Sequence, residues 1–209
     1  FLAKAFACMV AASRPNAPWY VWHSFHGQRE FQSALELVGL TIRAQIIWVK
    51  PSAGLGNAEF RSRHENAFVA GRDGQDVGLV LQEHGLGWFG HRLGAKPPTW
   101  LGERKQTSVW ECGRDSAKAL VHATQKPVDL LLRAMRLSSL PRNLVLDLFA
   151  GSGSTLAACE ASSRRCHCLE LDEAYTDVIV RRWQHLTGRK ATLLRDGKEL
   201  SAAMPKEKK

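Results

Sequence analysis

The sequence lacks any apolar run that could cross a membrane. No stretch approaches about 20 consecutive apolar residues, the length that a spanning helix needs. No signal-peptide pattern is visible either, so we expect a soluble, cytoplasmic protein. Acidic residues are also few, because 20 Asp and Glu stand against 29 Lys and Arg, for a net charge of +9. Lys and Arg contacts to phosphate dominate nucleic-acid binding, which makes nucleic acid the leading partner. A basic surface without such a partner stays open.

Cysteines are few, and their number is odd. The chain has five, at positions 8, 112, 159, 166 and 168, without the pairwise spacing of a metal site. This usage indicates reduced thiols in a cytoplasmic protein. The run Cys166-His167-Cys168 could suggest zinc. In a strand, however, the two cysteines face one side and the histidine the other, so we expect no metal site.

The chain is long enough for one domain with a sizeable core. Apolar periodicity predicts helices over 1–12, 28–38, 128–137 and 172–188, a further helix that includes 156–159, and strands over 19–22, 41–49, 66–70, 144–148, 166–171 and 191–194. The alternation of strands and helices predicts an α/β fold with a mostly parallel sheet and helices on both faces.

One stretch carries the strongest chemical signal. The apolar run 144–148 predicts a strand buried on both faces, interrupted near its end by Asp147. Gly151-Ser152-Gly153 then allows a sharp turn, and Ser154 or Thr155 can cap the following helix. The next strand carries Glu170 near its end, 19 residues after Gly151.

Such a unit binds a ligand at the carboxyl end of the sheet. Free N–H groups and the helix dipole attract an anionic group, and the distal acid can hold ribose hydroxyls. A dinucleotide site of the Gly-x-Gly-x-x-Gly type would need a third glycine where this chain has Leu156, and the P-loop pattern is absent. S-adenosylmethionine, which has an adenosine and a carboxylate but no pyrophosphate, fits the pattern better.

The runs DLFAGSGST at 147–155 and HATQKP at 122–127 together resemble the amino-group (N6-adenine or N4-cytosine) DNA methyltransferases. More narrowly, they resemble the subgroup whose catalytic motif and target-recognition region precede the cofactor motif. The resemblance covers roughly residues 19–194. It implies a Rossmann-like S-adenosylmethionine-dependent methyltransferase sheet, a place in restriction-modification and DNA as partner. The whole chain, 1–209, would be one domain, with 52–119 as a small, loop-rich recognition insertion and 120–194 as the cofactor-binding half.

The resemblance also implies cofactor-binding residues. The cofactor would be bound by Phe149, Gly151, Gly153 and Glu170, with Asp147 beneath it and Thr124, Gln125 and Lys126 supporting the same pocket. The family usually has proline where this chain has Ala123.

Basic and aromatic side chains alternate in the segment 52–119, which is rich in Gly, Arg, His and Trp. Such side chains stack on bases and neutralise phosphates. Composition alone favours a loop-rich excursion anchored by its tryptophans. The resemblance instead favours target recognition, and we expect Arg92, Arg104 and Lys105 to contact DNA. His23 and the run His64-Glu65-Asn66 are weaker candidates, for which a capping or surface role is favoured.

The catalytic tetrapeptide of the family, Asp/Asn/Ser-Pro-Pro-aromatic, does not occur in these 209 residues. Lys96-Pro97-Pro98-Thr99 has the proline pair but neither the acceptor nor the aromatic ring. We therefore name no catalytic residue, and expect the tetrapeptide on chain that would precede Phe1. The function expected is methylation of an exocyclic amino group in DNA, adenine N6 being favoured over cytosine N4. Two alternatives stay open: an inactive nucleic-acid-binding relic of the fold and a nicotinamide-dependent oxidoreductase.

Overall fold

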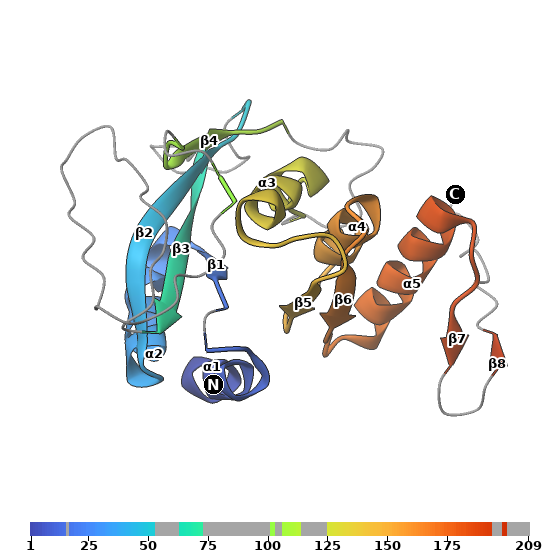
Figure 1. Cartoon of the computed structure of the whole chain (residues 1–209), viewed down its shortest axis with the longest axis horizontal. Helices are drawn as coiled ribbons and strands as arrows, with labels where there is room; N and C mark the ends of the chain where they lie inside the picture. The colour runs from blue at the N-terminus through green and yellow to red at the C-terminus, as the bar shows by residue number, and fades with distance from the viewer. Residues whose placement is uncertain are drawn as a thin grey trace. The chain divides into compact units, whose positions relative to one another are not determined.

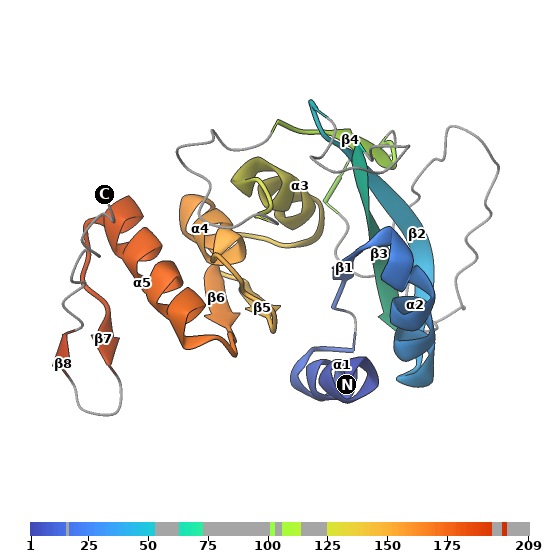
Figure 2. The same cartoon turned by 180° about the vertical axis from the view of Figure 1, so that it is seen from behind.

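The structure is a computed structural model and describes residues 1–15, 17–52, 63–72, 101–102, 106–113, 125–193 and 198–199. Contacts divide the chain into two compact units (Figures 1 and 2). The first unit comprises Phe1–Arg114 and Arg133–Leu140, and the second comprises Asp115–Leu132 and Pro141–Lys209. Among the helices of the described segments, none has the length and apolarity to cross a bilayer.

The first unit is built on a four-stranded sheet with the order β1-β3-β2-β4. Its elements in chain order are α1 (Leu2–Ala12), β1 (Trp19–His23), the short 3-10 helix η1 (Phe25–Gly27), α2 (Gln28–Leu37), β2 (Leu40–Val49), β3 (His64–Arg72) and β4 (Val109–Glu111). β3 runs antiparallel to both β1 and β2, while β4 is parallel to β2. The expectation of a mostly parallel sheet is therefore wrong for this unit. β1 and β2 are joined through η1 and α2, as the crossover between two strands of the same direction requires, but in the sheet β3 lies between them.

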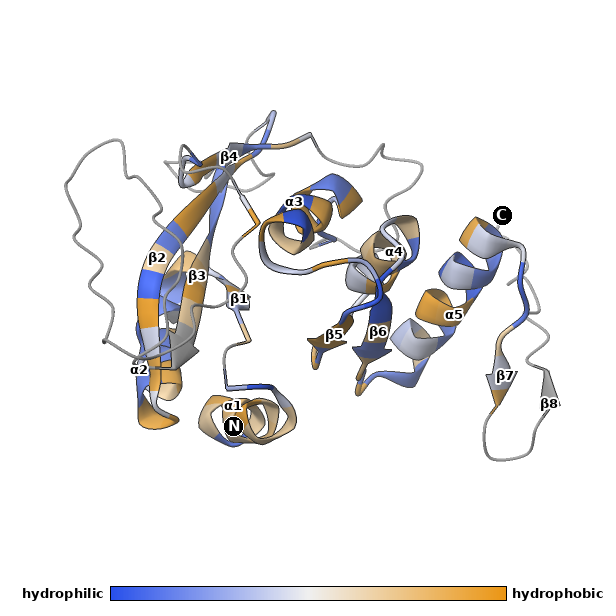
Figure 3. Ribbon diagram, viewed as in Figure 1, coloured by the Kyte–Doolittle hydropathy of each residue, from blue (hydrophilic) through white to orange (hydrophobic). Residues whose placement is uncertain are grey.

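Helices α1 and α2 cover one face of this sheet. Their apolar stripes meet the strands in a core made of Phe6, Trp19, Val21, Ala34, Leu35, Leu40, Phe68 and Ala70. Buried and less buried residues alternate along most of β2, because one side of the strand packs more closely than the other, and Figure 3 shows polar residues among the apolar ones of this strand. The positions of α1, α2, β1 and β2 confirm the apolar periodicity of the sequence.

The carboxyl ends of β1, β2 and β4 lie at one edge of the sheet. This follows from the pairing, because β1 and β2 both run opposite to β3, and β4 runs with β2. At this edge His23 lies opposite Asn66, and Val49 lies between His64 and Glu111. Ligands of α/β sheets bind outside the carboxyl ends of the parallel strands.

The second unit contains the glycine turn. Its elements are α3 (Val128–Ser138), whose last turns belong to the first unit, β5 (Leu144–Asp147), α4 (Ser154–Ala161), β6 (Arg165–Cys168), α5 (Glu173–Thr187), β7 (Thr192–Leu193) and β8 (Lys198–Glu199). β5 and β6 are parallel and in register from Leu144 opposite Arg165 to Asp147 opposite Cys168. The α5 boundaries are as predicted: the Asp172 carboxylate accepts the Ala174 N–H at 2.8 Å, and Gly188 ends the helix.

Two local expectations fail in this unit. β5 is not buried on both faces: Leu144 is 49% exposed and the other three residues are half-buried, because β6 is its one strand neighbour in the described chain. Ser154 does not cap α4. Gly153 occupies the N-cap position with φ 78°, and the Ser154 hydroxyl is used by an arginine of α5.

Candidate functional site

The backbone of the glycine turn continues the pairing of β5 and β6 beyond the ends of both strands. The Leu169 N–H donates to the Asp147 carbonyl at 2.8 Å, and the Ala150 N–H donates to the Leu169 carbonyl at 3.0 Å. The next amide, that of Gly151, donates to the Glu170 carboxylate oxygen Oε2 at 2.7 Å. The turn and the distal acid, 19 residues apart in sequence, are therefore in direct contact.

Glu170 is held by three backbone amides. Its Oε1 accepts from the N–H groups of Leu171 and Asp172 at 2.9 and 3.0 Å, and its Oε2 accepts from Gly151. Each carboxylate oxygen can accept about two hydrogen bonds. Oε2 therefore keeps room for one further donor, such as a ribose hydroxyl. The orientation of this acceptor is fixed before any ligand arrives.

The two glycines of the turn have different surroundings. Both have positive φ, 53° at Gly151 and 78° at Gly153. A Cβ on Gly153 would lie 3.1 Å from Ile179 Cγ2 of α5, so a side chain there would require Ile179 to shift. A Cβ on Gly151 would meet nothing nearer than the Phe149 carbonyl oxygen at 4.0 Å. Gly151 is therefore the place where a ligand can approach the bare backbone.

Asp147 and Phe149 complete the predicted cluster. The Asp147 carboxylate accepts the Phe149 N–H at 3.0 Å, which fixes the chain between strand and turn. The Phe149 ring is 51% exposed, although it is large and apolar. An exposed aromatic face beside an open backbone turn and an anchored carboxylate suits an adenosine, whose base is flat and whose ribose carries two hydroxyls. The arrangement fits the cofactor expected from the sequence.

Amides expected to be free for an anionic group are used within the protein. Those of Phe149, Ala150, Gly151 and Gly153 all donate to oxygens of the protein itself. The turn therefore offers the acceptor Glu170 rather than a row of donors. A neutral ribose suits such a site better than the pyrophosphate of a dinucleotide.

An arginine that was not predicted from the sequence donates hydrogen bonds to the turn. Arg182 of α5 donates from Nη1 to the Ser152 carbonyl at 3.1 Å and to the Ser154 hydroxyl at 3.2 Å. Both serines are buried. Arg182 lies three residues after Ile179, so the two share a helix face. That spacing is the sequence signal that could have identified it.

The other predicted site residues are less well defined. Gln125 is buried and Lys126 is half-buried just before α3. Thr124, Arg92, Arg104 and Lys105 lie outside the described residues. Their roles stay predictions.

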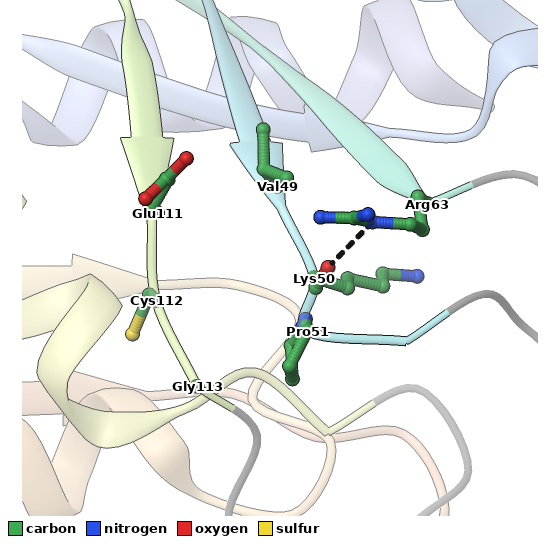
Figure 4. A pocket seen from close by; sticks show the side chains of 7 residues that line it. All are labelled: Val49, Lys50, Pro51, Arg63, Glu111, Cys112 and Gly113. Carbon is green, nitrogen blue, oxygen red and sulfur yellow. Dashed lines mark hydrogen bonds between the residues drawn. The ribbon is translucent and has the colours of Figure 1, made fainter.

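A pocket of about 290 Å³ opens in the first unit, at the carboxyl ends of β2 and β4 (Figure 4). It is lined by Val49, Lys50, Pro51, Arg63, Glu111, Cys112 and Gly113. The Arg63 Nε donates to the Lys50 carbonyl at 3.2 Å, which fixes the chain beyond β2. Ligand sites usually measure about 300 to 1,000 Å³, so this pocket has the size for a small group such as one base.

Lys50 is buried at this edge and carries an ion pair. Its Nζ lies 2.5 Å from Glu65 Oε1 and 5.3 Å from the centre of the Trp48 ring. The side chain is 10% exposed. A lysine is rarely buried without a partner. The surface role favoured for the run His64-Glu65-Asn66 is confirmed at His64, which is exposed, whereas Glu65 takes part in a partly buried ion pair.

The candidates His23 and Asn66 are also buried rather than on the surface. They face each other across β1 and β3, and the His23 ring lies 4.3 Å from that of Phe68. Among the residues that the structure describes, the atoms His23 Nε2 and Asn66 Oδ1 have no hydrogen-bond partner. Aromatic packing accounts for the position of His23, and nothing in the described residues accounts for the two unpaired atoms.

Comparison with known proteins gives relatives that include Type II methyltransferases. The Type II methyltransferase M.BglII of Bacillus subtilis is 26% identical over 168 residues, which are 76% of this chain and 46% of that protein. M.HinfI of Haemophilus influenzae is 33% identical over 92 residues, 40% of this chain and 26% of that protein. The chain thus spans less than half the length of these relatives. The crystal structure of the M1.HpyAVI–SAM complex has a similar fold, with a TM-score of 0.64 at 20% identity over 87% of this chain and 81% of that one.

The family itself is shown by a longer match. The sequence model of the DNA methylase family N6_N4_Mtase matches residues 20–181. This range includes the paired strands β1 to β3, the glycine turn and most of α5. The resemblance to the amino-group DNA methyltransferases is therefore confirmed at the level of the family, and the chain belongs to the N6_N4_Mtase family of DNA methylases.

Proposed function

We propose that the protein transfers a methyl group from S-adenosylmethionine to an exocyclic amino group of a base in DNA. The observation that carries the proposal is the Gly151 amide bonded to Glu170, beside an open approach to the backbone of Gly151. Membership in the DNA methylase family supports it. The cofactor supplies a methyl group on a positively charged sulfur.

In this proposal the second unit binds the cofactor. Oε2 of Glu170 accepts a hydrogen bond from a ribose hydroxyl, since it has capacity beyond the bond from Gly151. Phe149 offers its exposed ring to the adenine, and Asp147 holds the Phe149 backbone in place. Gly151 allows the ligand to approach the main chain. Each residue acts on position, which is the main source of rate in a transfer between two bound groups.

We further propose that the pocket beside Lys50 receives the target base. Enzymes that modify a base take it out of the duplex into a small site and read its polar edge. The ion pair with Glu65 fixes the position of the Lys50 ammonium group, and Lys50 lines the pocket. Glu111, which also lines the pocket, adds a hydrogen-bond acceptor. A flipped base could hydrogen-bond to such groups.

The family tetrapeptide Asp/Asn/Ser-Pro-Pro-aromatic does not occur among the 209 residues. We therefore assign to none of them the role of accepting a hydrogen bond from the reacting amino group. Adenine N6 remains our prediction over cytosine N4. The single-domain arrangement, with 52–119 as recognition insertion and 120–194 as cofactor-binding half, is likewise a proposal.

Methyl transfer by the intact protein tests the function. DNA is incubated with the protein and methyl-labelled S-adenosylmethionine, then digested to nucleosides for mass spectrometry. We expect labelled N6-methyladenine. Labelled N4-methylcytosine would show that the predicted target base is wrong while the proposed methyl transfer stands. Cofactor binding without any transfer to DNA would instead identify a non-catalytic member of the family.

A further inference from the structure

Helix α5 contacts the glycine turn at two neighbouring points. Ile179 lies against Gly153, where a built Cβ would come within 3.1 Å of Cγ2. One turn further along, Arg182 donates to the Ser152 carbonyl and to the Ser154 hydroxyl. These bonds fall on both sides of Gly153. The turn is therefore contacted both by α5, through Ile179 and Arg182, and by Glu170, through the Gly151 amide.

The peptide between Ser152 and Gly153 is held at its N–H, which donates to the Ala150 carbonyl at 2.8 Å, and at its carbonyl, which accepts from Arg182. Glycine adopts positive and negative φ with similar ease, so without such bonds the peptide that precedes Gly153 can flip at little energetic cost. Gly151 and Gly153 lie on either side of Ser152, both with positive φ. A flip would turn the Ser152 carbonyl away from α5 and change the surface that the turn presents beside Gly151.

A guanidinium is well suited to prevent that flip. Its N–H donors lie in one rigid plane, and their bonds to a carbonyl are assisted by the positive charge. Arg182 applies this to a buried carbonyl and a buried hydroxyl at once. A lysine would bring the charge but only a compact donor on a flexible stem.

The neighbouring residue provides a contrast. Arg181 pairs with Asp177 on the same helix at 3.2 Å, and its side chain is 34% exposed. Adjacent in sequence and equal in charge, Arg181 and Arg182 thus have different surroundings. A comparison of the two separates the effect of charge on α5 from the effect of contact with the turn.

We propose that Arg182 is a positioning residue for the cofactor: it locks the Ser152–Gly153 peptide so that the turn and Glu170 keep one shape for ligand binding. This inference rests on the proposed function. Arg182 acts through the turn and needs no contact with the ligand. Replacing Arg182 should therefore raise the Kd for S-adenosylmethionine while the chain stays folded.

Calorimetric titration with S-adenosylmethionine tests the proposal on the full chain. We expect Arg182→Ala to raise the Kd at least about tenfold, as loss of charge-assisted hydrogen bonds implies. Arg182→Lys should fall between Arg182→Ala and the wild type, and Arg181→Ala should match the wild type. Guanidinium ion at millimolar concentration should restore binding to Arg182→Ala, and tetramethylammonium at equal ionic strength should not.

A second readout reports on the turn itself. Amide hydrogen exchange at Gly151 measures the bond to Glu170. We expect faster exchange of this amide in Arg182→Ala, with little change at core amides of the first unit. Trp183 of α5 donates its indole N–H to the Glu160 carboxylate of α4, and Trp183→Phe, which removes this bond, controls for general loosening of α5. It should leave the Gly151 amide and the Kd unchanged.

The failing outcomes are distinct. If the wild type binds the cofactor and Arg182→Ala binds it equally well, the positioning role is wrong while the proposed function stands. The role is also wrong if Trp183→Phe weakens binding as much as Arg182→Ala does. If the wild type itself takes up no S-adenosylmethionine, the proposed function fails and the role of Arg182 with it. Should Arg182→Ala not fold, Ser154→Ala removes one acceptor instead, and an unchanged Kd there contradicts the proposal.

Discussion

The Gly151 amide N–H and the Glu170 carboxylate are 2.7 Å apart, and this hydrogen bond joins two loops that follow different strands. It ties the turn after β5 to a residue two positions beyond the end of β6. A carboxylate fixed by backbone donors does not have to lose side-chain freedom when a ligand binds. The site is thus preorganised by its own main chain.

The two turn glycines should respond differently to alanine. Gly153→Ala combines a positive φ with a 3.1 Å contact to Ile179, so we expect a loss of about 3 kcal/mol in unfolding free energy. Gly151→Ala has the φ penalty alone, about 1–2 kcal/mol. Urea denaturation measures both. Yet Gly151→Ala should abolish cofactor binding while the chain stays folded, because its methyl group occupies the approach to the turn.

A control for this pair uses the background Ile179→Ala, in which the crowding atoms are gone. The additional cost of Gly153→Ala should be smaller there than in the wild type. Equal costs in both backgrounds would mean that the contact with Ile179 does not contribute to the destabilisation caused by Gly153→Ala.

The buried ion pair at the edge of the first sheet should contribute to stability mainly when one partner is removed. Lys50→Met leaves Glu65 without its cation, and we expect a loss of about 1–3 kcal/mol. This is below the range for fully buried pairs, because the Glu65 side chain is 27% exposed. Denaturant titration should show the double variant Lys50→Met/Glu65→Gln recovering part of the loss. A double variant less stable than the sum of the single changes would contradict this account.

Thiols on β6 should make the fold sensitive to alkaline pH. The Sγ atoms of Cys166 and Cys168 lie 3.3 Å apart on one side of the strand, as the alternation predicted, with His167 exposed on the other. Hydrogen bonding to Cys159 raises the pKa of Cys166 well above its ordinary value of 9.0. Hydrogen bonding to Cys166 likewise raises the pKa of Cys168.

The sign of the effect follows from these directions. Below pH 9 both states keep the thiols protonated, and above it the unfolded chain loses protons that the folded chain retains. The unfolding free energy should therefore fall as the pH rises above about 9. Denaturation at a series of pH values measures this slope. The variant Cys166→Ala/Cys168→Ala should have a shallower slope, and an unchanged slope would exclude the thiols as its source.

The DNA contact predicted from the sequence is tested by salt. Arg104→Ala and Lys105→Ala should each weaken DNA binding and reduce the salt slope of log K by about one unit, as expected for one lost phosphate contact. Arg181→Ala, an equal charge change on α5, serves as control. Unchanged binding in both variants would remove these two residues from the interface.

The contact between the glycine turn and Glu170 was predictable because its signals are local. Gly151, Gly153 and Glu170 occupy fixed positions after two short strands, so spacing alone brings them together. Arg182 was not predictable from composition, because Arg181 precedes it and only the helix face separates them. The three-residue strand β4 was missed because it is too short for alternation to be seen, although Trp110 within it is buried. The direction of β3 depends on pairing between distant segments, which single-sequence periodicity does not report.

The most direct test of the account is calorimetric titration of the 209-residue chain with S-adenosylmethionine, comparing the wild type with Glu170→Gln and Glu173→Gln. The wild type and Glu173→Gln, which alters an exposed acid at the start of α5, should bind one equivalent with the same Kd. Glu170→Gln should bind S-adenosylmethionine about ten to a hundred times more weakly, since it loses the negatively charged carboxylate that accepts a hydrogen bond from the ribose hydroxyl. Equal binding by all three proteins, or no binding by the wild type, would contradict the assignment of the glycine turn as the cofactor site.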